Sequence, residues 1–292
     1  MKKTIISMCA VLTIVALCVL VACSKVSVSE EKSEPSGNLK VTVFEIAKTP
    51  FGSLTRVEEP ASAACTRLNF AVYDENGSRV KQVNQTSDMA NFGTASFQLE
   101  EGDYTLVVVG HSSSGNPTMT NLKKIQFTNS TGYTDTFLCC GEVTIGEEPQ
   151  ELKVSLERIV SMCRFVLTDD IPVEVKKMRF YYTGGSGAFN ALTGFGCVAS
   201  KQTVFFDVSS GTQKQFDLYT FLHETESDIS LLVTAYDDDD NVLYERDFEV
   251  PMEQNHITWL TGAFFNGSGS SSTSISGVTV NTDWAGETHI TF

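Results

Sequence analysis

Apolar and polar residues alternate with a period of two along most of this chain. Residues 39–44 show the alternation, and in 151–157 the apolar side chains Leu152, Val154 and Leu156 fall on one face. Half-buried strands have this pattern, because successive side chains point to opposite faces of a sheet. Further predicted strands are 68–73, 104–110, 137–145, 159–168, 173–182, 203–208, 229–236, 242–250, 257–264, 275–281 and 288–292. We therefore predict an all-β fold with the spacing of a β-sandwich, and a short helix or coil only within 49–67.

One hairpin pattern occurs twice. A strand ending in Tyr73-Asp74 and a strand ending in Tyr236-Asp237 are each followed by a polar turn and a second strand. Two interpretations stay open: a duplicated β domain, or the ordinary likeness of two surface hairpins. In either case we predict two β-sandwich domains, 39–150 and 151–292, that meet near Pro149. A Gly/Ser-rich stretch then predicts a flexible loop before the last short strands.

The amino terminus has the features of an export signal. Lys2 and Lys3 precede an apolar run that ends at Val21, which is too short for a stable membrane span. The run closes with Leu20-Val21-Ala22-Cys23, which resembles the bacterial lipobox. That resemblance implies removal of residues 1–22, a diacylglycerol on the Cys23 sulfur and further acylation, with 23–38 as a polar tether. The alternative is an ordinary secretory signal with a chance cysteine.

Charge excludes two classes of partner. The 292-residue chain has a formal charge of −15, and removal of Lys2 and Lys3 with the signal brings it to −17. Such a surface repels nucleic acid and anionic membrane, so neither is expected to bind it. Solubility alone accounts for the acidity, which therefore indicates no specific function.

Five cysteines would remain beside Cys23: Cys65, Cys139, Cys140, Cys163 and Cys197. Export to an oxidising compartment allows one or two disulfides, and an odd number leaves at least one thiol. The adjacent Cys139 and Cys140 point to opposite faces of a strand and are not expected to pair with each other. The cysteines lack histidines at the spacing of a zinc site, so we predict no metal site.

Three segments match catalytic or ligand-binding motifs in sequence but lack other features that each motif requires. Residues 110–115, which include His111, miss the nucleophile elbow by one glycine, and no helical pattern follows. Residues 194–199 match a dinucleotide fingerprint but lead into a strand, and 237–241 lack the glycine and glutamate of a calcium loop. Tyr181 and Tyr182 form the aromatic pair most suited to a ligand. We predict neither enzymatic activity nor a cofactor other than the lipid on Cys23.

Four segments together resemble the FimB/Mfa2-type fimbrial anchor family of Bacteroides and Porphyromonas relatives. They are the lipobox at Cys23, residues 68–77, residues 156–165 and the ending around Asp283-Trp284. Met162-Cys163 departs from the small residues expected at that place. The resemblance implies two tandem transthyretin-like (Ig-like, Greek-key) β-sandwiches on a lipoprotein of the outer membrane. It further implies that the chain holds or caps a fimbria at the cell surface and supports adhesion.

Strand exchange with fimbrial subunits is the mode of binding that this resemblance implies. In related polymerising subunits a protease cuts after an early arginine, and Arg56 and Arg67 lie in that region. A cut would remove Cys23 and its lipid, so an anchor should stay uncut. The alternatives are a polymerising or tip subunit of the fimbria, or a glycan-binding surface lipoprotein of a polysaccharide-uptake system.

Overall fold

The structure is a computed structural model that describes residues 37–48, 57–59, 61–266, 274–275 and 285–292. The predicted signal peptide lies outside these residues, as does the tether up to residue 36. Asn38 is already part of the fold, since its side chain exchanges hydrogen bonds of 2.8 and 2.9 Å with the backbone of Leu99. Apart from the short α2 (Ala61–Ala64), the regular elements described are strands, which confirms the all-β prediction.

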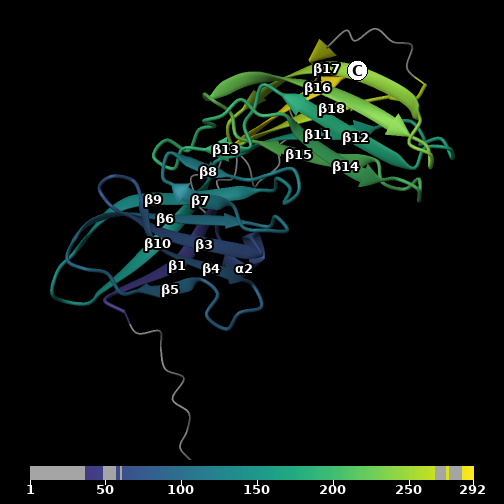
Figure 1. The fold of residues 1–292 in the computed structure, drawn as a ribbon. Helices are drawn as coiled ribbons and strands as arrows, with labels where there is room; N and C mark the ends of the chain where they lie inside the picture. Colours follow the sequence, from purple (N-terminus) through teal and green to yellow (C-terminus); the bar gives the residue numbers. More distant parts are fainter. Residues whose placement is uncertain (1–36, 49–56, 60, 267–273, 276–284) are drawn as a thin grey trace, which may run out of the picture. The chain divides into compact units, whose positions relative to one another are not determined.

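The first sheet has eight strands in the order β2-β1-β10-β9-β6-β3-β4, with β5 paired to β1 (Figure 1). They are β1 (Leu39–Lys48), β2 (Val57–Glu59), β3 (Arg67–Tyr73), β4 (Arg79–Thr86), β5 (Thr94–Phe97), β6 (Gly102–His111), β9 (Thr136–Ile145) and β10 (Gln150–Arg158). β1 runs parallel to β10, and on its other side it pairs first with β5 and then with β2. Its alternate side chains Leu39, Val41 and Val43 are buried in one core with Phe70 of β3.

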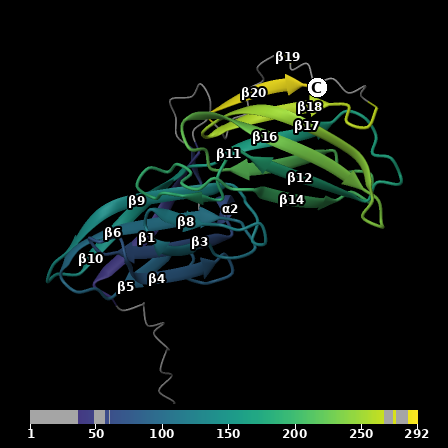
Figure 2. The ribbon, with the colours of Figure 1, turned by 45° about the horizontal axis from the view of Figure 1, so that its top comes forward.

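Two more sheets enclose a second core. One has the order β15 (Gln215–Thr220), β11 (Ser161–Leu167), β18 (His256–Gly262), β20 (Gly286–Thr291), β19 (Ser274–Ile275). The other has the order β14 (Gln202–Asp207), β12 (Lys177–Thr183), β16 (Glu226–Tyr236), β17 (Val242–Glu253). Phe165 of the five-stranded sheet and Phe180 and Phe248 of the four-stranded sheet meet in this core. The pair is a β-sandwich. Figure 2 labels its strands except β15.

A third core lies on the opposite face of β3 and β6. Ala71 of β3 and Val107 of β6 pack there with Phe189 of a small sheet. That sheet has the order β13 (Ala188–Phe189), β8 (Lys124–Gln126), β7 (Thr118–Asn121). Met162 of β11 and Ile257 of β18 complete the same cluster. Because β3 and β6 are covered on both faces, they are buried along most of their length rather than at every second residue.

The two hairpins that resemble each other in sequence have the same turn. Asp74 Oδ1 accepts backbone hydrogen bonds from Asn76 and Ser78, at 3.0 and 2.9 Å. Asp237 Oδ1 accepts the matching bonds from residues 239 and 241, both at 2.9 Å. In β3–β4 and in β16–β17 the register also shifts at the tyrosine before the aspartate. The aspartate side chain thus closes each turn by satisfying two amides that the ladder leaves unpaired.

Some strands depart from the sequence prediction. The predicted strand 173–182 begins only at Lys177, since Pro172 to Lys176 form a turn and an irregular segment. β4 is the second strand of the first predicted hairpin, but it shows no alternation, because its side chains are mostly polar and exposed, as expected of a strand at a sheet edge. The short β5, β7, β8 and β13 lack enough residues to show a period. The helix α2 follows Pro60 within the predicted helix-or-coil segment.

β10 is the strand that the predicted domain boundary at residue 150 would place in the second domain. It starts at Gln150 and pairs with β1 and β9, so this strand belongs to the first sheet. The chain enters the five-stranded sheet only at Ser161. The division into two domains therefore stays a prediction, with Ile159 and Val160 as the link between the sheets. No helix among the described residues is long and apolar enough to cross a membrane.

Candidate functional site

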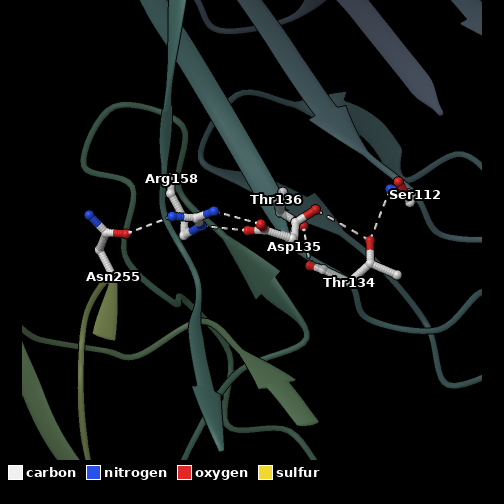
Figure 3. A network of polar contacts seen from close by, with 6 residues as sticks. All are labelled: Ser112, Thr134, Asp135, Thr136, Arg158 and Asn255. Atoms are coloured by element: carbon white, nitrogen blue, oxygen red, sulfur yellow. Dashed lines mark hydrogen bonds and ion pairs between the residues drawn. The ribbon is translucent and has the colours of Figure 1, made fainter. Parts of the chain in front are cut away.

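Arg158, at the end of β10, is the centre of a buried polar network (Figure 3). Its guanidinium donates two hydrogen bonds to the carboxylate of Asp135, at 2.7 and 2.8 Å, and one of 3.4 Å to Asn255 Oδ1. It also lies 5.0 Å from the ring centroid of Phe137. Only 2% of the Arg158 side chain is exposed, against 26% of Asp135. The two hydrogen bonds to the Asp135 carboxylate compensate the buried positive charge of Arg158. Together with the bond to Asn255, they hold three chain segments together.

The network extends from Arg158 in two directions. Thr136 Oγ1 donates to the carbonyl of Thr134, and Thr134 Oγ1 accepts from the backbone amide of Ser112. On the other side, the backbone N–H of Asn255 donates to the carbonyl of Val160. The backbone carbonyl of Asn255 accepts from the N–H of Ala285, the residue before β20. One buried arginine thus connects the loop before β9 with the turn that leads into β18 and with the start of β20. Since its guanidinium is bound by Asp135 and Asn255 of the fold itself, we assign Arg158 a structural role.

A second row of side chains crosses the outer face of the five-stranded sheet. Asp217, Arg164, Trp259 and His289 occupy paired positions on β15, β11, β18 and β20. Asp217 accepts two hydrogen bonds from Arg164, at 2.7 and 2.8 Å, and the guanidinium lies 4.8 Å from the Trp259 ring centroid. Trp259 stacks on His289, at 5.4 Å between centroids. β20 is thus joined to its sheet by backbone pairing and ring stacking on this face.

His111, in the segment that partly matches a nucleophile elbow, is a buried structural residue. Its Nε2 lies 2.7 Å from Asn69 Oδ1, and its Nδ1 accepts the amide hydrogen of Ser113 at 3.1 Å. Both ring nitrogens are therefore in use, and the ring is neutral with its proton on Nε2. Burial, with a smaller contribution from the positive charge of Arg67, lowers the pKa of His111 to about 4.

Acidification is expected to destabilise the fold through His111. The unfolded imidazole has a pKa near 6.5 and the folded one a pKa of about 4, so the unfolded chain binds the extra proton between these values. Stability should therefore fall by roughly 3 kcal/mol as the pH drops from 6.5 to about 4, and this contribution then levels off. Urea unfolding at several pH values measures the change.

The variant His111→Gln separates this effect from the titration of carboxylates. Its free energy of unfolding should depend less steeply on pH across the same interval, whereas His223→Gln at an exposed site should follow the wild type. Equal slopes for His111→Gln and the wild type would contradict the assignment.

Of the residues predicted for lipid attachment and for protease cleavage, the structure describes Arg67 alone. Cys23 and Arg56 lie outside the described residues and stay predictions. Arg67 lies on β3, which pairs with β4 on one side and β6 on the other. Its guanidinium donates to the carbonyls of Ser113 and Ser114, at 3.0 and 2.9 Å. A protease needs an extended, unpaired segment, so a cut after Arg67 would require β3 to leave the sheet.

The aromatic pair Tyr181–Tyr182 is not a ligand platform, contrary to the sequence expectation. Tyr182 is fully buried, and its hydroxyl donates a 2.9 Å hydrogen bond to the carbonyl of Tyr219. Tyr181 points to the other face of β12, where the guanidinium of Arg179 lies 5.0 Å from its ring centroid. The neighbouring glycines are tightly packed: a Cβ on Gly185 would overlap Thr220 Oγ1. Strand alternation sends the two rings to opposite faces.

None of the five cysteines in the described ranges forms a disulfide. Burial raises the pKa of Cys65 and of Cys163 to about 12, and that of Cys140 to about 11, so these thiols stay protonated and unreactive. Cys197 is exposed. Over the same ranges, no three His, Cys, Asp or Glu side chains gather in a way that could hold a metal ion.

Several solved structures align with the chain at low identity. A candidate adhesin from Bacteroides ovatus has 18% identity and a TM-score of 0.46, over 64% of this chain and 77% of the other. A candidate cell adhesion protein from the same species has 12% identity and a TM-score of 0.45, over 84% and 95%. The fimbrial anchor protein Mfa2 from Porphyromonas gingivalis has 14% identity and a TM-score of 0.41, over 72% and 81%. The fimbrial anchor family named from the sequence is thus represented among these structures.

No curated protein matches the chain. A family model described as a family of unknown function, DUF6562, matches residues 35–291. The match includes the three cores, the Arg158 network and the row from Asp217 to His289. The chain therefore belongs to the DUF6562 family.

Proposed function

We propose that this protein is a surface lipoprotein that anchors or caps a fimbria at the outer membrane, without enzymatic activity. Acyl chains on Cys23 would hold it in the membrane, at about 0.8 kcal/mol for each buried methylene, and residues 24–36 would space the fold from the lipid. Fimbrial subunits would bind by strand exchange. The lipobox-like signal, the all-β fold and the placement of one strand support the proposal.

That strand is β20, and its position is the observation that carries the proposal. It lies parallel to β18 over six residue pairs, from His256–Gly286 to Thr261–Thr291. On its other side, the described pairing is with the two residues of β19 alone. It follows a Gly/Ser-rich stretch. A strand next to a sheet edge can be exchanged at low cost, since few ladders have to open.

The core contacts of β20 suit strand exchange. Ile290 is buried, and the ring of Phe292 packs against Phe165 and Phe248, with centroids 5.1 and 4.7 Å apart. If β20 left, it would open an apolar groove beside β18. A partner strand with apolar side chains at alternate positions would refill that groove, while β20 could pair with the partner in turn.

β1 is a less suitable strand for exchange in an uncut chain. It pairs with β10, β5 and β2, and Leu39, Val41 and Ile46 are fully buried. Its release would break three sets of pairing and expose much of the first core. An anchor that keeps Cys23 also keeps β1 attached to the fold, so we assign the exchange to β20.

Locking β20 to its own sheet tests the strand assignment. Thr261 and Thr291 are paired neighbours on β18 and β20, so Thr261→Cys with Thr291→Cys should form a disulfide across the pair. Cells carrying this variant should shed fimbriae into the medium, and a reductant added during assembly should restore attachment. Separately, Cys23→Ala should move the protein out of the membrane fraction.

The matched control is Ser230→Cys with Glu249→Cys, which bridges the exposed pair on β16 and β17 and should leave fimbriae attached. Normal attachment with the 261–291 disulfide formed, as judged on a non-reducing gel, would exclude exchange through β20. Retention of Cys23→Ala in the membrane fraction would exclude lipid anchoring at Cys23.

A further inference from the structure

The outer face of the four-stranded sheet has a hollow of about 400 Å³, a volume in the range of small-molecule sites. It lies where β12 and β14 meet the turn between β16 and β17. Its lining includes Lys176, Lys177, Phe205, Asp207, Asp237 and Asp240. None of these side chains belongs to the Arg158 network or to the row from Asp217 to His289.

Lys177 occupies a defined position in this hollow. Its Nζ lies 5.5 Å from the ring centroid of Phe205 and 5.2 Å from that of Tyr236, and it forms an ion pair with Asp240. On the neighbouring strand β14, the residue paired with Lys177 is Asp207. Two rings and a carboxylate hold the ammonium group, so little rotamer entropy is left to lose when a ligand binds.

The carboxylates are also oriented in advance. Asp237 accepts hydrogen bonds from the backbone and side chain of Asn241, and Asp207 accepts bonds from Ser209. These bonds lower the pKa of Asp237 and of Asp207, so both stay ionised as hydrogen-bond acceptors. The hollow therefore presents ordered acceptors next to ordered donors.

Phe205 supplies an apolar surface beside these polar groups. Its side chain is 55% exposed, whereas its neighbour Phe206 packs into the core against Phe180 and Phe216. Exposure of more than half of a phenylalanine costs free energy that a polar residue at this position would avoid. One function of an exposed ring at the rim of a polar hollow is to stack against the C–H face of a ligand.

The mixture of charges restricts the ligand class. An anion would meet Asp207, Asp237 and Asp240, and a cation would meet Lys176 and Lys177. A neutral polyol avoids both repulsions and can donate to the carboxylates while it accepts from the ammonium groups. We propose that this hollow is a binding subsite for a neutral sugar unit, which stacks on Phe205 and is bound through its hydroxyls by Lys177 and the aspartates.

Saturation-transfer NMR and titration with the methyl glycosides of glucose, galactose, mannose and N-acetylglucosamine test this subsite on the full-length protein in detergent. At least one glycoside should bind. Phe205→Ala should weaken that binding about tenfold, because the stacking surface is lost, and Phe205→Trp should retain it. The matched control is Phe44→Ala, since Phe44 is 50% exposed on β1 and lies outside the hollow; its binding should equal that of the wild type.

Three results would overturn the proposal. They are no binding of any neutral glycoside, binding that Phe205→Ala leaves unchanged, and binding of charged sugars such as glucuronate or glucosamine in place of the neutral ones. Lys177→Gln provides a second route if Phe205→Ala does not fold, because loss of the ammonium donor should also weaken binding.

Discussion

Phe165→Ala is expected to lower the free energy of unfolding by about 3–5 kcal/mol, the usual cost of truncating a buried phenylalanine. Phe165 is fully buried in the sandwich core. Its ring lies 5.1–6.0 Å from four others, those of Phe180, Phe248, Phe264 and Phe292. Rigid rings on both sheets cannot collapse into the space, so the cavity would persist. Urea unfolding followed by circular dichroism measures the loss.

The neighbouring residue provides the control. Val166 points to the opposite face of β11 and is half-buried, so Val166→Ala should cost less than about 1 kcal/mol. Comparable losses for the two variants would show that the two faces of β11 are packed alike, which contradicts the core described above.

Arg158→Met is expected to cost about 3 kcal/mol. Removal of one partner from a buried ion pair leaves the other without its counter-charge, and the cost is typically about 3–5 kcal/mol. The lower end applies because Asp135 retains 26% exposure and would be partly hydrated. The variant also loses the hydrogen bond to Asn255 and the contact with the Phe137 ring. The free energy of unfolding in urea measures the effect.

A second substitution shows whether the unpaired carboxylate causes this loss. Arg158→Met with Asp135→Leu should be more stable than Arg158→Met alone, because no charge is then left without a partner. Lys214→Ala is the control for an ion pair at the surface, with Asp170, and should change stability little. If Arg158→Met unfolds at the same urea concentration as the wild type, the network does not hold these segments together.

The amino-acid sequence by itself determined the local structure. Strand alternation identified β1, β3, β10 and most of the longer strands, because the period of two is a property of each segment alone. The repeated Tyr-Asp pattern identified two equivalent hairpins, because each aspartate closes its own turn. The same reasoning rejected residues 110–115 as a nucleophile elbow, and in the structure β6 ends at His111 and the next element described is the strand β7.

Only the tertiary structure decided which segments meet. The parallel pairing of β1 with β10 and of β18 with β20 joins residues far apart in the chain, and alternation carries no information on such partners. The partners of Arg158 come from two distant loops, so its burial could not be read from β10. Likewise, Tyr182 is buried and Phe205 exposed because packing between sheets, rather than hydrophobicity, sets which face of a strand is covered.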